Sequence, residues 1–485
     1  MYSNRMKIKS ISLAVLLAFG TVSSYALAKD VAEKPQPNIV IIFADDMGYG
    51  DIEAYNPDSK IATPNLNQMA ARGMAFTDAH TSSAVCTPSR YSILTGRYAW
   101  RTHLKRGVLR GHSAALIEPD RTTIASMLQS QGYKTIAVGK WHIGIGAAET
   151  DYWGKLKGGP NSVGFDYFYG IPASLDMEPY VYIENESLDT PLTGRVIKAS
   201  KNRRSGGEGF WRKGLIGEGF EHQDTLSTLN NKAMEQIKLA SQSTEGKPFF
   251  LYYALPAPHT PWLPSKASKG KTGAGYYGDF VVDVDNLVGQ VNNQLEELGI
   301  ADNTIVIYSS DNGAHWSNKD KKKYGHLANG KLRGQKADIY EAGHRVPLII
   351  NWPGKVTAGK VNSSLVVLND LLATVASITD TDIKNVEGLD SADFSSELLS
   401  EGTTNYDRGA VIHHSFKGMF AIRKGDWKLV EGAGSGGFTH VKSDGHSMQL
   451  YNLKEDPAET TNLVEKHPTL VNELLAELNE IRGND

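Results

Sequence analysis

The chain contains a single cysteine, Cys86, and its neighbours favour a chemical role for it. One thiol among 485 residues cannot form an internal disulfide or a multi-thiolate metal site, so it is either an inert apolar residue or one with a chemistry of its own. Pro88 suits the first turn of a helix, where its missing N–H group has no consequence. We therefore expect Cys86 at a helix N-terminus, where exposed N–H groups favour negative charge.

Two short acidic segments carry the donors of a candidate metal site. Asp45 and Asp46 are adjacent, as are Asp311 and Asn312, and a glycine follows each pair within two residues. All four side chains offer hard oxygen atoms, which suit Ca²⁺ or Mg²⁺, whereas Zn²⁺ more often recruits histidine or thiolate. The segments predict a site for a divalent cation, and the alternative is a pair of unrelated turns.

These side chains need a scaffold, and the apolar pattern predicts one. Continuous apolar runs, typical of strands buried on both faces, occupy residues 38–43, 135–138, 249–255 and 304–308, with a further candidate at 346–350. Helical segments open at Thr63 and at Thr122 or Thr123. The alternation predicts an α/β fold with a large, mostly parallel sheet and helices on both faces.

Polar clusters follow four of these strands. Asp45 comes after the first strand, Lys140 and His142 after the second, His259 after the third, and Asp311 after the fourth. In an open α/β sheet, ligands bind at the carboxyl ends of the strands. A carboxylate after a strand is often only a turn or a cap, but four clusters in the same place indicate one site.

The C-terminal part has a different pattern. Residues 365–378 resemble a last helix of the large domain, and short strands are then expected at 410–413, 419–423, 427–430 and 449–453. A closing helix carries leucines at helical spacing. The predicted organisation is an N-terminal α/β catalytic domain over 29–385 and a C-terminal α+β subdomain over 386–485, with an antiparallel sheet and one helix.

The first 28 residues predict an export signal. A basic region precedes a mostly apolar stretch, and Ala26-Leu27-Ala28 offers a small-residue cleavage site. The apolar stretch is too short to span a membrane, and an uncleaved N-terminal anchor is the alternative. We expect a periplasmic or secreted protein that uses the export machinery and has no stable membrane insertion. The formal net charge of −3 argues against nucleic acid as a partner.

Several short motifs occur in a fixed order along the chain, and together they resemble those of a known family. Cys86-Thr87-Pro88-Ser89-Arg90 has the form Cys-x-Pro-x-Arg, and it is followed by Gly139-Lys140-Trp141-His142, Pro258-His259-Thr260-Pro261 and Ser310-Asp311-Asn312-Gly313. Lys336 lies four residues before Tyr340, and Ser174 ends the segment Gly-Ile-Pro-Ala-Ser. This set resembles the motifs of the formylglycine-dependent (type I) sulfatases of the alkaline phosphatase superfamily, over nearly the whole mature chain.

The resemblance implies a cofactor chemistry. A formylglycine-generating maturation enzyme would oxidise Cys86 to formylglycine, whose hydrate attacks the sulfur of a sulfate ester. The ligands of the divalent ion would be Asp45, Asp46, Asp311, Asn312 and the modified Cys86. Ca²⁺ is the expected ion and Mg²⁺ the alternative.

The resemblance also implies roles in catalysis. Arg90 would stabilise the nucleophile and support the metal site. His259 is expected to be the general acid for the leaving alkoxide, and His142 the base that releases sulfate, although the two roles could be exchanged.

A further set of residues is expected to bind substrate. Lys140 and Lys336 would bind sulfate oxygens, and Ser174 matches an active-site serine of the family. His315, two residues beyond the Asp-Asn-Gly turn, is expected to touch the leaving sugar.

The predicted function is hydrolysis of sulfate monoesters. The favoured substrates are oligosaccharides of sulfated polysaccharides, desulfated from chain ends, with carrageenan-type galactans first and glycosaminoglycans or small aryl sulfates as alternatives. A phosphatase or phosphodiesterase of the same superfamily is less favoured, because such enzymes typically use Ser or Thr and two zinc ions. A sulfoglycan-binding protein without activity is less favoured because every expected catalytic position is filled.

Overall fold

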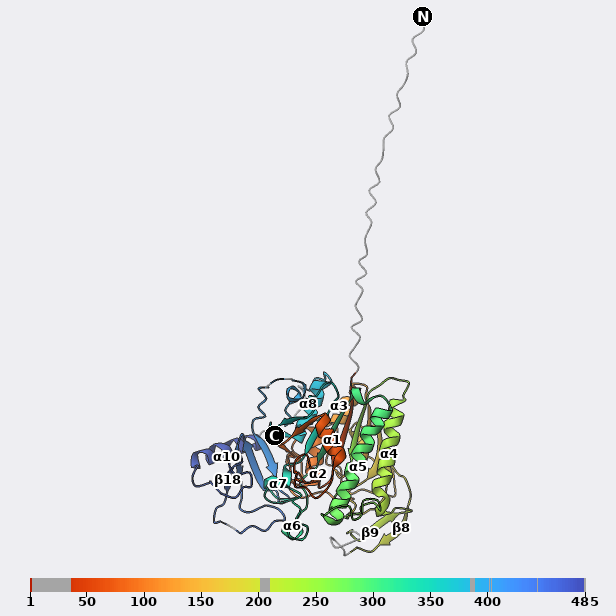
Figure 1. The fold of residues 1–485 in the computed structure, drawn as a ribbon. Helices are drawn as coiled ribbons and strands as arrows, with labels where there is room; N and C mark the ends of the chain where they lie inside the picture. Colours follow the sequence, from red (N-terminus) through yellow and green to blue (C-terminus); the bar gives the residue numbers. More distant parts are fainter. Residues whose placement is uncertain are drawn as a thin grey trace. The chain divides into compact units, whose positions relative to one another are not determined.

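A large sheet organises the computed structural model (Figure 1). The structure describes Met1 and residues 36–483 apart from 201–209, 384–388, 401, 403 and 443. The chain divides into two units, Met1–Pro35 and Gln36–Asp485, and the helices and strands of the described residues belong to the second. The export signal predicted over residues 1–28 lies outside the described residues, Met1 aside. In the described ranges, no helix is long and apolar enough to cross a membrane.

The sheet has ten strands within the described part of the chain, and its centre is parallel. In spatial order the strands are β13 (Lys360–Asn362), β2 (Met74–Phe76), β12 (Leu348–Asn351), β11 (Thr304–Ser310), β1 (Asn38–Ala44), β10 (Phe249–Ala254), β4 (Lys134–Lys140), β5 (Tyr167–Ile171), β6 (Ile183–Glu184) and β7 (Ser187–Leu188). The strands from β11 to β5 run parallel, with Ile41 opposite both Ile307 and Tyr252. The predicted mostly parallel sheet is confirmed, and the strand expected at 346–350 is the antiparallel β12.

Both faces of this sheet are buried. Ile39 and Phe43 of β1 contribute to one apolar layer, and Val40 and Ile42 contribute to the other. The first layer is covered by α2 (Cys86–Thr95), α3 (Ile124–Ser130) and α8 (Leu371–Ile378), and the second by α1 (Pro64–Arg72), α4 (Thr225–Ser241) and α5 (Gly275–Glu297). In Figure 1, α4 and α5 lie side by side. Helices on both faces explain why the strands are continuous apolar runs.

The predicted helix starts are correct in position but differ in their capping. Thr123 caps α3 as expected, because its side chain accepts a hydrogen bond from the Ser126 N–H group. Thr63 precedes α1, but its side chain accepts from the Glu53 N–H group instead of capping the helix.

The segment 365–378 is only partly helical, which corrects the expectation for it. Val366 and Val367 form β14, which pairs with β3 (Ala79–His80), and α8 begins at Leu371. Two β-branched residues in sequence suit a strand better than a helix. The shorter elements of the body are α6 (Asn318–Tyr324), α7 (Glu341–His344), α9 (Ser395–Leu399), β8 (Leu192–Ile197) and β9 (Gly214–Gly217).

The C-terminal part forms a small antiparallel sheet with one helix, as predicted. Its strands are β15 (Val411–His414), β16 (Phe420–Lys424), β17 (Trp427–Val430) and β18 (Gln449–Asn452), paired in sequence order. The closing helix α10 (Pro468–Gly483) packs Val471, Leu474 and Leu478 against this sheet. We call β15–β18 with α10 the C-terminal subdomain.

Candidate active site

The parallel strands end at one edge of the sheet, and the predicted site residues follow these ends. Asp45 follows β1, Asp311 follows β11, Lys140 ends β4, Ser174 comes three residues after β5, and His259 five residues after β10. Backbone hydrogen bonds continue past the strands, since the Asp311 N–H group donates to the Ala44 carbonyl at 3.1 Å. Strand register therefore brings together residues that are far apart in the sequence.

Cys86 is the first residue of α2, as predicted, and it is 2% exposed. Its Sγ lies 3.6 Å from Oδ1 of Asp45 and 3.2 Å from Nζ of Lys336. Burial raises the pKa of the Cys86 thiol, and the Asp311 carboxylate adds to that rise. Burial thus affects the pKa of the thiol more strongly than the helix N-terminus does. Unmodified Cys86 is therefore protonated, and a protonated thiol is a weak nucleophile.

Two buried lysines neutralise the adjacent carboxylates. Nζ of Lys140 lies 2.6 Å from Oδ2 of Asp45, and Nζ of Lys336 lies 2.6 Å from Oδ1 of Asp46. Burial alone would raise the pKa of Asp45, but Lys140 and other cationic groups nearby hold that pKa well below its usual range. The site thus holds anionic oxygen atoms and ammonium groups beside the Cys86 thiol.

Arg90 supports the site from one turn further along α2. Its Nε donates to Oδ2 of Asp311 at 2.9 Å, and its Nη1 donates to the Lys140 carbonyl at 3.1 Å. Burial and the neighbouring Asp45 carboxylate raise the pKa of Asp311 to about 6, against the opposing effect of Arg90. The guanidinium therefore positions both the end of β4 and a candidate metal ligand.

The oxygen donors fit a hard divalent cation. Asp46 has a φ of 65°, which is the sharp turn expected between two adjacent ligands. Nδ2 of Asn312 donates to Oδ1 of Asp46 at 2.7 Å, while the buried Oδ1 of Asn312 has no hydrogen-bond partner within the described part of the chain. Possible ligand atoms of Asp45, Asp46, Cys86 and His259 lie within 4.8 Å of one another. An orphaned amide oxygen beside carboxylates is suited to Ca²⁺ or Mg²⁺.

His142 has one ring nitrogen fixed and the other free. Its Nε2 lies 2.9 Å from the Leu109 carbonyl, so Nε2 carries the proton and donates it. The buried Nδ1 has no hydrogen-bond partner among the residues that the structure describes. Burial, together with Lys140, holds the pKa of His142 well below its usual range. The ring is therefore neutral, with a lone pair available at Nδ1.

His259 lies beside the carboxylates. Its Nδ1 donates to the Thr260 carbonyl, and its Nε2 lies 3.8 Å from Oδ2 of Asp46. Burial, followed by the Lys336 ammonium, lowers the pKa of His259. The sequence predicted His259 at the same edge of the sheet as Asp45, and the structure brings a possible ligand atom of this ring within 4.8 Å of those of Asp45 and Asp46.

The two remaining predicted residues differ in burial. Ser174 is buried and its Oγ has no hydrogen-bond partner. His315 is half-buried, and its ring centroid lies 5.2 Å from that of Phe438. Phe438 and the Leu109 carbonyl were not anticipated from the sequence. A backbone carbonyl leaves no signature in the sequence, and Phe438 lies in a glycine-rich segment without periodicity.

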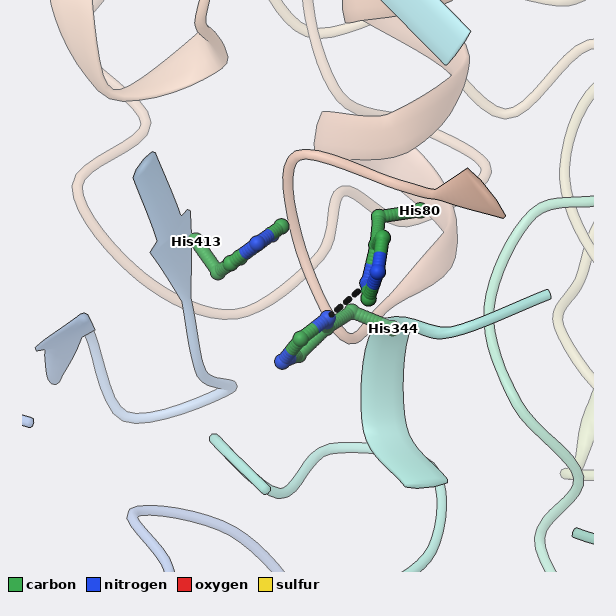
Figure 2. Close-up of side chains that lie close together, drawn as sticks. All are labelled: His80, His344 and His413. Atoms are coloured by element: carbon green, nitrogen blue, oxygen red, sulfur yellow. Dashed lines mark hydrogen bonds between the residues drawn. The ribbon is translucent and has the colours of Figure 1, made fainter. Parts of the chain in front are cut away.

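A second group of possible metal ligands consists of His80, His344 and His413 (Figure 2). Nδ1 of His80 lies 3.0 Å from Nδ1 of His344, and Nδ1 of His413 donates to the Thr81 carbonyl at 2.9 Å. The rings of His344 and His413 stack, with centroids 3.9 Å apart and 11° between their planes. Because an imidazole binds a metal in its own ring plane, two stacked rings cannot share one ion. We call this group the histidine cluster, and its contacts are those of packing.

Comparison with known proteins gives the family. The sulfatase family model matches residues 37–381, and the model of the N-sulphoglucosamine sulphohydrolase C-terminal region matches residues 335–484. The N-acetylgalactosamine-6-O-sulfatase of Bacteroides thetaiotaomicron is 33% identical over 506 residues, which cover 96% of this chain and 97% of the relative. Arylsulfatase A of Homo sapiens is 32% identical over 461 residues, with 90% and 85% covered.

Solved structures agree with this result. A structure described with the metabolism of multiple glycosaminoglycans by Bacteroides thetaiotaomicron has a TM-score of 0.82 at 31% identity, covering 93% of this chain and 100% of that chain. Ps i-CgsB in complex with k-i-k-neocarrahexaose has a TM-score of 0.72 at 25% identity, covering 93% and 94%. The chain therefore belongs to the formylglycine-dependent sulfatases of the alkaline phosphatase superfamily, and it is a sulfuric ester hydrolase.

Proposed function

We propose that this sulfatase removes sulfate esters from the chain ends of sulfated glycans built of galacto-configured sugars. The observation that carries the reaction is the position of Cys86, buried at the start of α2 with Lys336 3.2 Å from its Sγ. A nucleophile at this depth reaches a sulfate group presented on a chain end more easily than one within a long chain. Exolytic action follows from that access.

The nucleophile of the proposed reaction is formylglycine made from Cys86. When present, formylglycine supplies a hydrated aldehyde as nucleophile and the divalent cation supplies a Lewis acid. Asp45, Asp46, Asp311 and Asn312 would hold the cation. Ca²⁺ is favoured over Mg²⁺ because four oxygen-bearing side chains come together, whereas Mg²⁺ usually keeps several waters and only one or two carboxylates.

The chain's own side chains handle the sulfate group. Lys140 and Lys336 orient its oxygen atoms and oppose their charge in a buried site, where electrostatic interactions are strong. The unpartnered Oγ of Ser174 is available to donate a hydrogen bond to the substrate. Nδ1 of His142 is available to accept a proton. His259 is the candidate general acid for the leaving alkoxide, and it acts from Nε2 only after that atom takes up a proton, because the Nδ1 proton is donated to the Thr260 carbonyl.

Two kinds of relative support a galacto-configured substrate. The relative that matches along nearly the full length is named for N-acetylgalactosamine 6-O-sulfate, and a structural neighbour holds a neocarrahexaose. N-acetylgalactosamine and the galactose of carrageenan share the axial oxygen at C4. Carrageenan, which the sequence analysis favours, and glycosaminoglycans are therefore both candidate substrates.

Sulfate release from a substrate panel tests the proposal. The full chain is coexpressed with a formylglycine-generating enzyme and incubated with carrageenan, chondroitin, agaran, fucoidan and aryl sulfate substrates. We expect release from a galacto-configured sugar, and a loss of at least about 10³-fold in Cys86→Ala. Release from carrageenan would identify a galactan as the substrate, and release from chondroitin oligosaccharides would identify a glycosaminoglycan. Release from aryl sulfate alone contradicts the glycan proposal.

The metal is tested in the same assay. Dialysis against a chelator should abolish release, and restoration by Ca²⁺ in preference to Mg²⁺ supports the proposed ion. Full activity after exhaustive chelation, verified by elemental analysis, contradicts a metal-dependent site.

The remaining proposals concern maturation and location. We propose that the first 28 residues are an export signal, that the export machinery delivers the protein to the periplasm or the medium, and that a formylglycine-generating enzyme acts on Cys86. Mass spectrometry of the peptide around Cys86 and of the mature N-terminus tests both events.

A further inference from the structure

Three aromatic side chains form a surface ridge beside the active site. Phe438 is 45% exposed, and it is informative because further aromatic rings lie beside it. Its ring centroid lies 5.2 Å from that of His315 and 5.5 Å from that of Phe416. We call these three side chains the aromatic ridge. The contacts with His315 and Phe416 restrict the Phe438 ring, and nearly half of its surface is left to solvent.

The backbone of Phe438 is tied to the sulfate-binding end of the site. Its N–H group donates to Oδ1 of Asp338 at 2.8 Å. Asp338 comes two residues after Lys336, whose Nζ lies 3.2 Å from Sγ of Cys86. The exposed ring is therefore anchored to the same turn that carries a sulfate-binding candidate.

The other two members of the ridge are attached to the same turn. The Phe416 N–H group donates to the Ala337 carbonyl at 3.0 Å, and the Ala337 N–H group donates to the Ala84 carbonyl at 2.8 Å. The Lys336 N–H group donates to the carbonyl of Ala314, the residue before His315, at 3.0 Å. Three separate segments that carry aromatic rings are thus hydrogen-bonded to the turn that follows Lys336.

Basic side chains lie on the loops next to the ridge. The Gly107 N–H group donates to the Phe416 carbonyl at 2.8 Å, so the loop carrying exposed Arg106 lies against Phe416. The exposed Lys417 follows Phe416 directly, and its N–H group donates to the Gly436 carbonyl at 3.0 Å. Exposed cations on loops next to aromatic rings complement a sulfated sugar, which combines an apolar C–H face with anionic substituents.

We propose that the aromatic ridge is a stacking platform for the sugar ring that carries the sulfate ester, with Phe438 as the residue that selects for it. The inference rests on the proposed glycan sulfatase function. In a galacto-configured pyranose the axial oxygen at C4 leaves the hydrogens of C3, C4 and C5 together on one face. That face is flat and apolar, and it packs on an aromatic ring with the sulfate directed toward Lys336. Binding energy gained there adds to the affinity for substrate without touching the reacting atoms.

Steady-state kinetics of Phe438 variants test the platform. Substrates are the glycan sulfates that the wild type hydrolyses, and inorganic sulfate serves as a competitive inhibitor that occupies only the buried pocket. We expect Phe438→Ala to raise KM about ten-fold, equivalent to ~1.4 kcal/mol, with kcat within about two-fold. The inhibition constant of inorganic sulfate should not change. Phe438→Trp should keep the low KM, and Phe438→Leu should lose it, because leucine offers no flat ring face.

A matched control and the opposing outcomes complete the test. Leu239 of α4 is 56% exposed, and Leu239→Ala should leave both KM and kcat unchanged. Unchanged KM in Phe438→Ala with an active wild type overturns the platform and leaves the glycan sulfatase function intact. If the wild type hydrolyses aryl sulfate alone, both the stacking of a sugar on the aromatic ridge and the proposed glycan sulfatase function are wrong. A ten-fold loss of sulfate inhibition in Phe438→Ala also overturns the platform, because the buried pocket would then be disturbed.

Discussion

At the scale of single residues, burial decides which groups are charged. Cys86 is a protonated thiol because burial opposes the thiolate more than Lys336 favours it. Oxidation of this residue to an aldehyde would remove that obstacle, because an aldehyde hydrate needs no thiolate. Asp311 shows the same effect, since its pKa rises to about 6 although Arg90 contacts it. Arg90 therefore compensates a buried charge.

The first prediction removes that compensation. Arg90→Met keeps much of the side-chain volume but leaves the buried Asp311 carboxylate without its guanidinium partner. We expect a loss of about 3–5 kcal/mol in the free energy of unfolding, measured by urea denaturation. Arg72→Ala is the matched control, because Arg72 pairs with Glu296 in solvent, and its loss should be under about 1 kcal/mol. Equal effects of the two variants would contradict the assigned role of Arg90.

At the scale of elements, the histidine cluster joins parts that are distant in sequence (Figure 2). His80 comes from β3, His344 from α7 and His413 from β15, so the cluster connects the large sheet body to the C-terminal subdomain. The charged groups that face these rings are Asp78, Glu341, Arg423 and Lys428. Burial is the main cause that lowers the pKa of all three histidines, and the rings are therefore neutral in the folded chain.

Neutral buried histidines make the fold sensitive to acid. The pKa of each ring is lower in the folded chain than the value near 6.5 expected when unfolded, so the unfolded chain binds more protons below pH 6.5. Their contribution to stability is therefore complete above pH 6.5 and is lost as the pH falls toward the folded pKa values. Glu459 acts in the opposite direction, because burial raises its pKa to about 7.

The second prediction isolates this contribution with His413→Gln, which cannot be protonated. The wild type takes up one more proton on unfolding at acid pH than the variant does. Between pH 7.5 and pH 5, its free energy of unfolding should therefore fall by about 2 kcal/mol more than that of the variant. Comparing the two chains cancels the effect of Glu459. The control is His440→Gln, since His440 is exposed. Parallel stability curves for wild type and His413→Gln would show that His413 does not titrate on unfolding.

At the scale of the whole described unit, the C-terminal subdomain completes the catalytic body. Lys428 of β17 is buried, with Nζ 3.0 Å from Oε1 of Glu341 and 2.8 Å from Oε1 of Glu459. Glu341 begins α7, five residues after Lys336. Phe416 and Phe438 come from loops of the same C-terminal part. The subdomain thus braces the segment that carries a sulfate-binding candidate, and its loops supply two of the three rings of the aromatic ridge.

The third prediction breaks this connection. Lys428→Met leaves two buried glutamates facing each other without their shared cation, so we expect a loss of about 3–5 kcal/mol in unfolding free energy. Thermal and urea unfolding measure it. Lys424→Met on the neighbouring strand β16 is the control, because Lys424 is exposed and its pair with the half-buried Glu477 should contribute far less to stability than a buried pair. A Lys428→Met chain as stable as the control would show that the subdomain is held by apolar packing alone.

Much of the fold was predictable because its signals are local. The apolar runs of β1, β10 and β11 mark strands covered on both faces, and Pro88 marks the start of α2. The apolar pattern of residues 365–378 predicts one helix over the whole segment, although only its second half is helical and Val366 and Val367 form a strand. Their pairing with β3 depends on a strand nearly 300 residues earlier, which no local pattern indicates.

The sequence alone determined the family, the identity of the candidate nucleophile and the types of the metal donors, because side-chain chemistry and motif spacing are written directly in the chain. The tertiary structure alone decided which groups are charged and which rings lie at the rim. The protonated thiol of Cys86, the free Nδ1 of His142 and the exposed face of Phe438 all depend on burial and on partners from other elements. Such properties arise from long-range packing, where solvent is excluded and distant carbonyls, carboxylates and rings become neighbours.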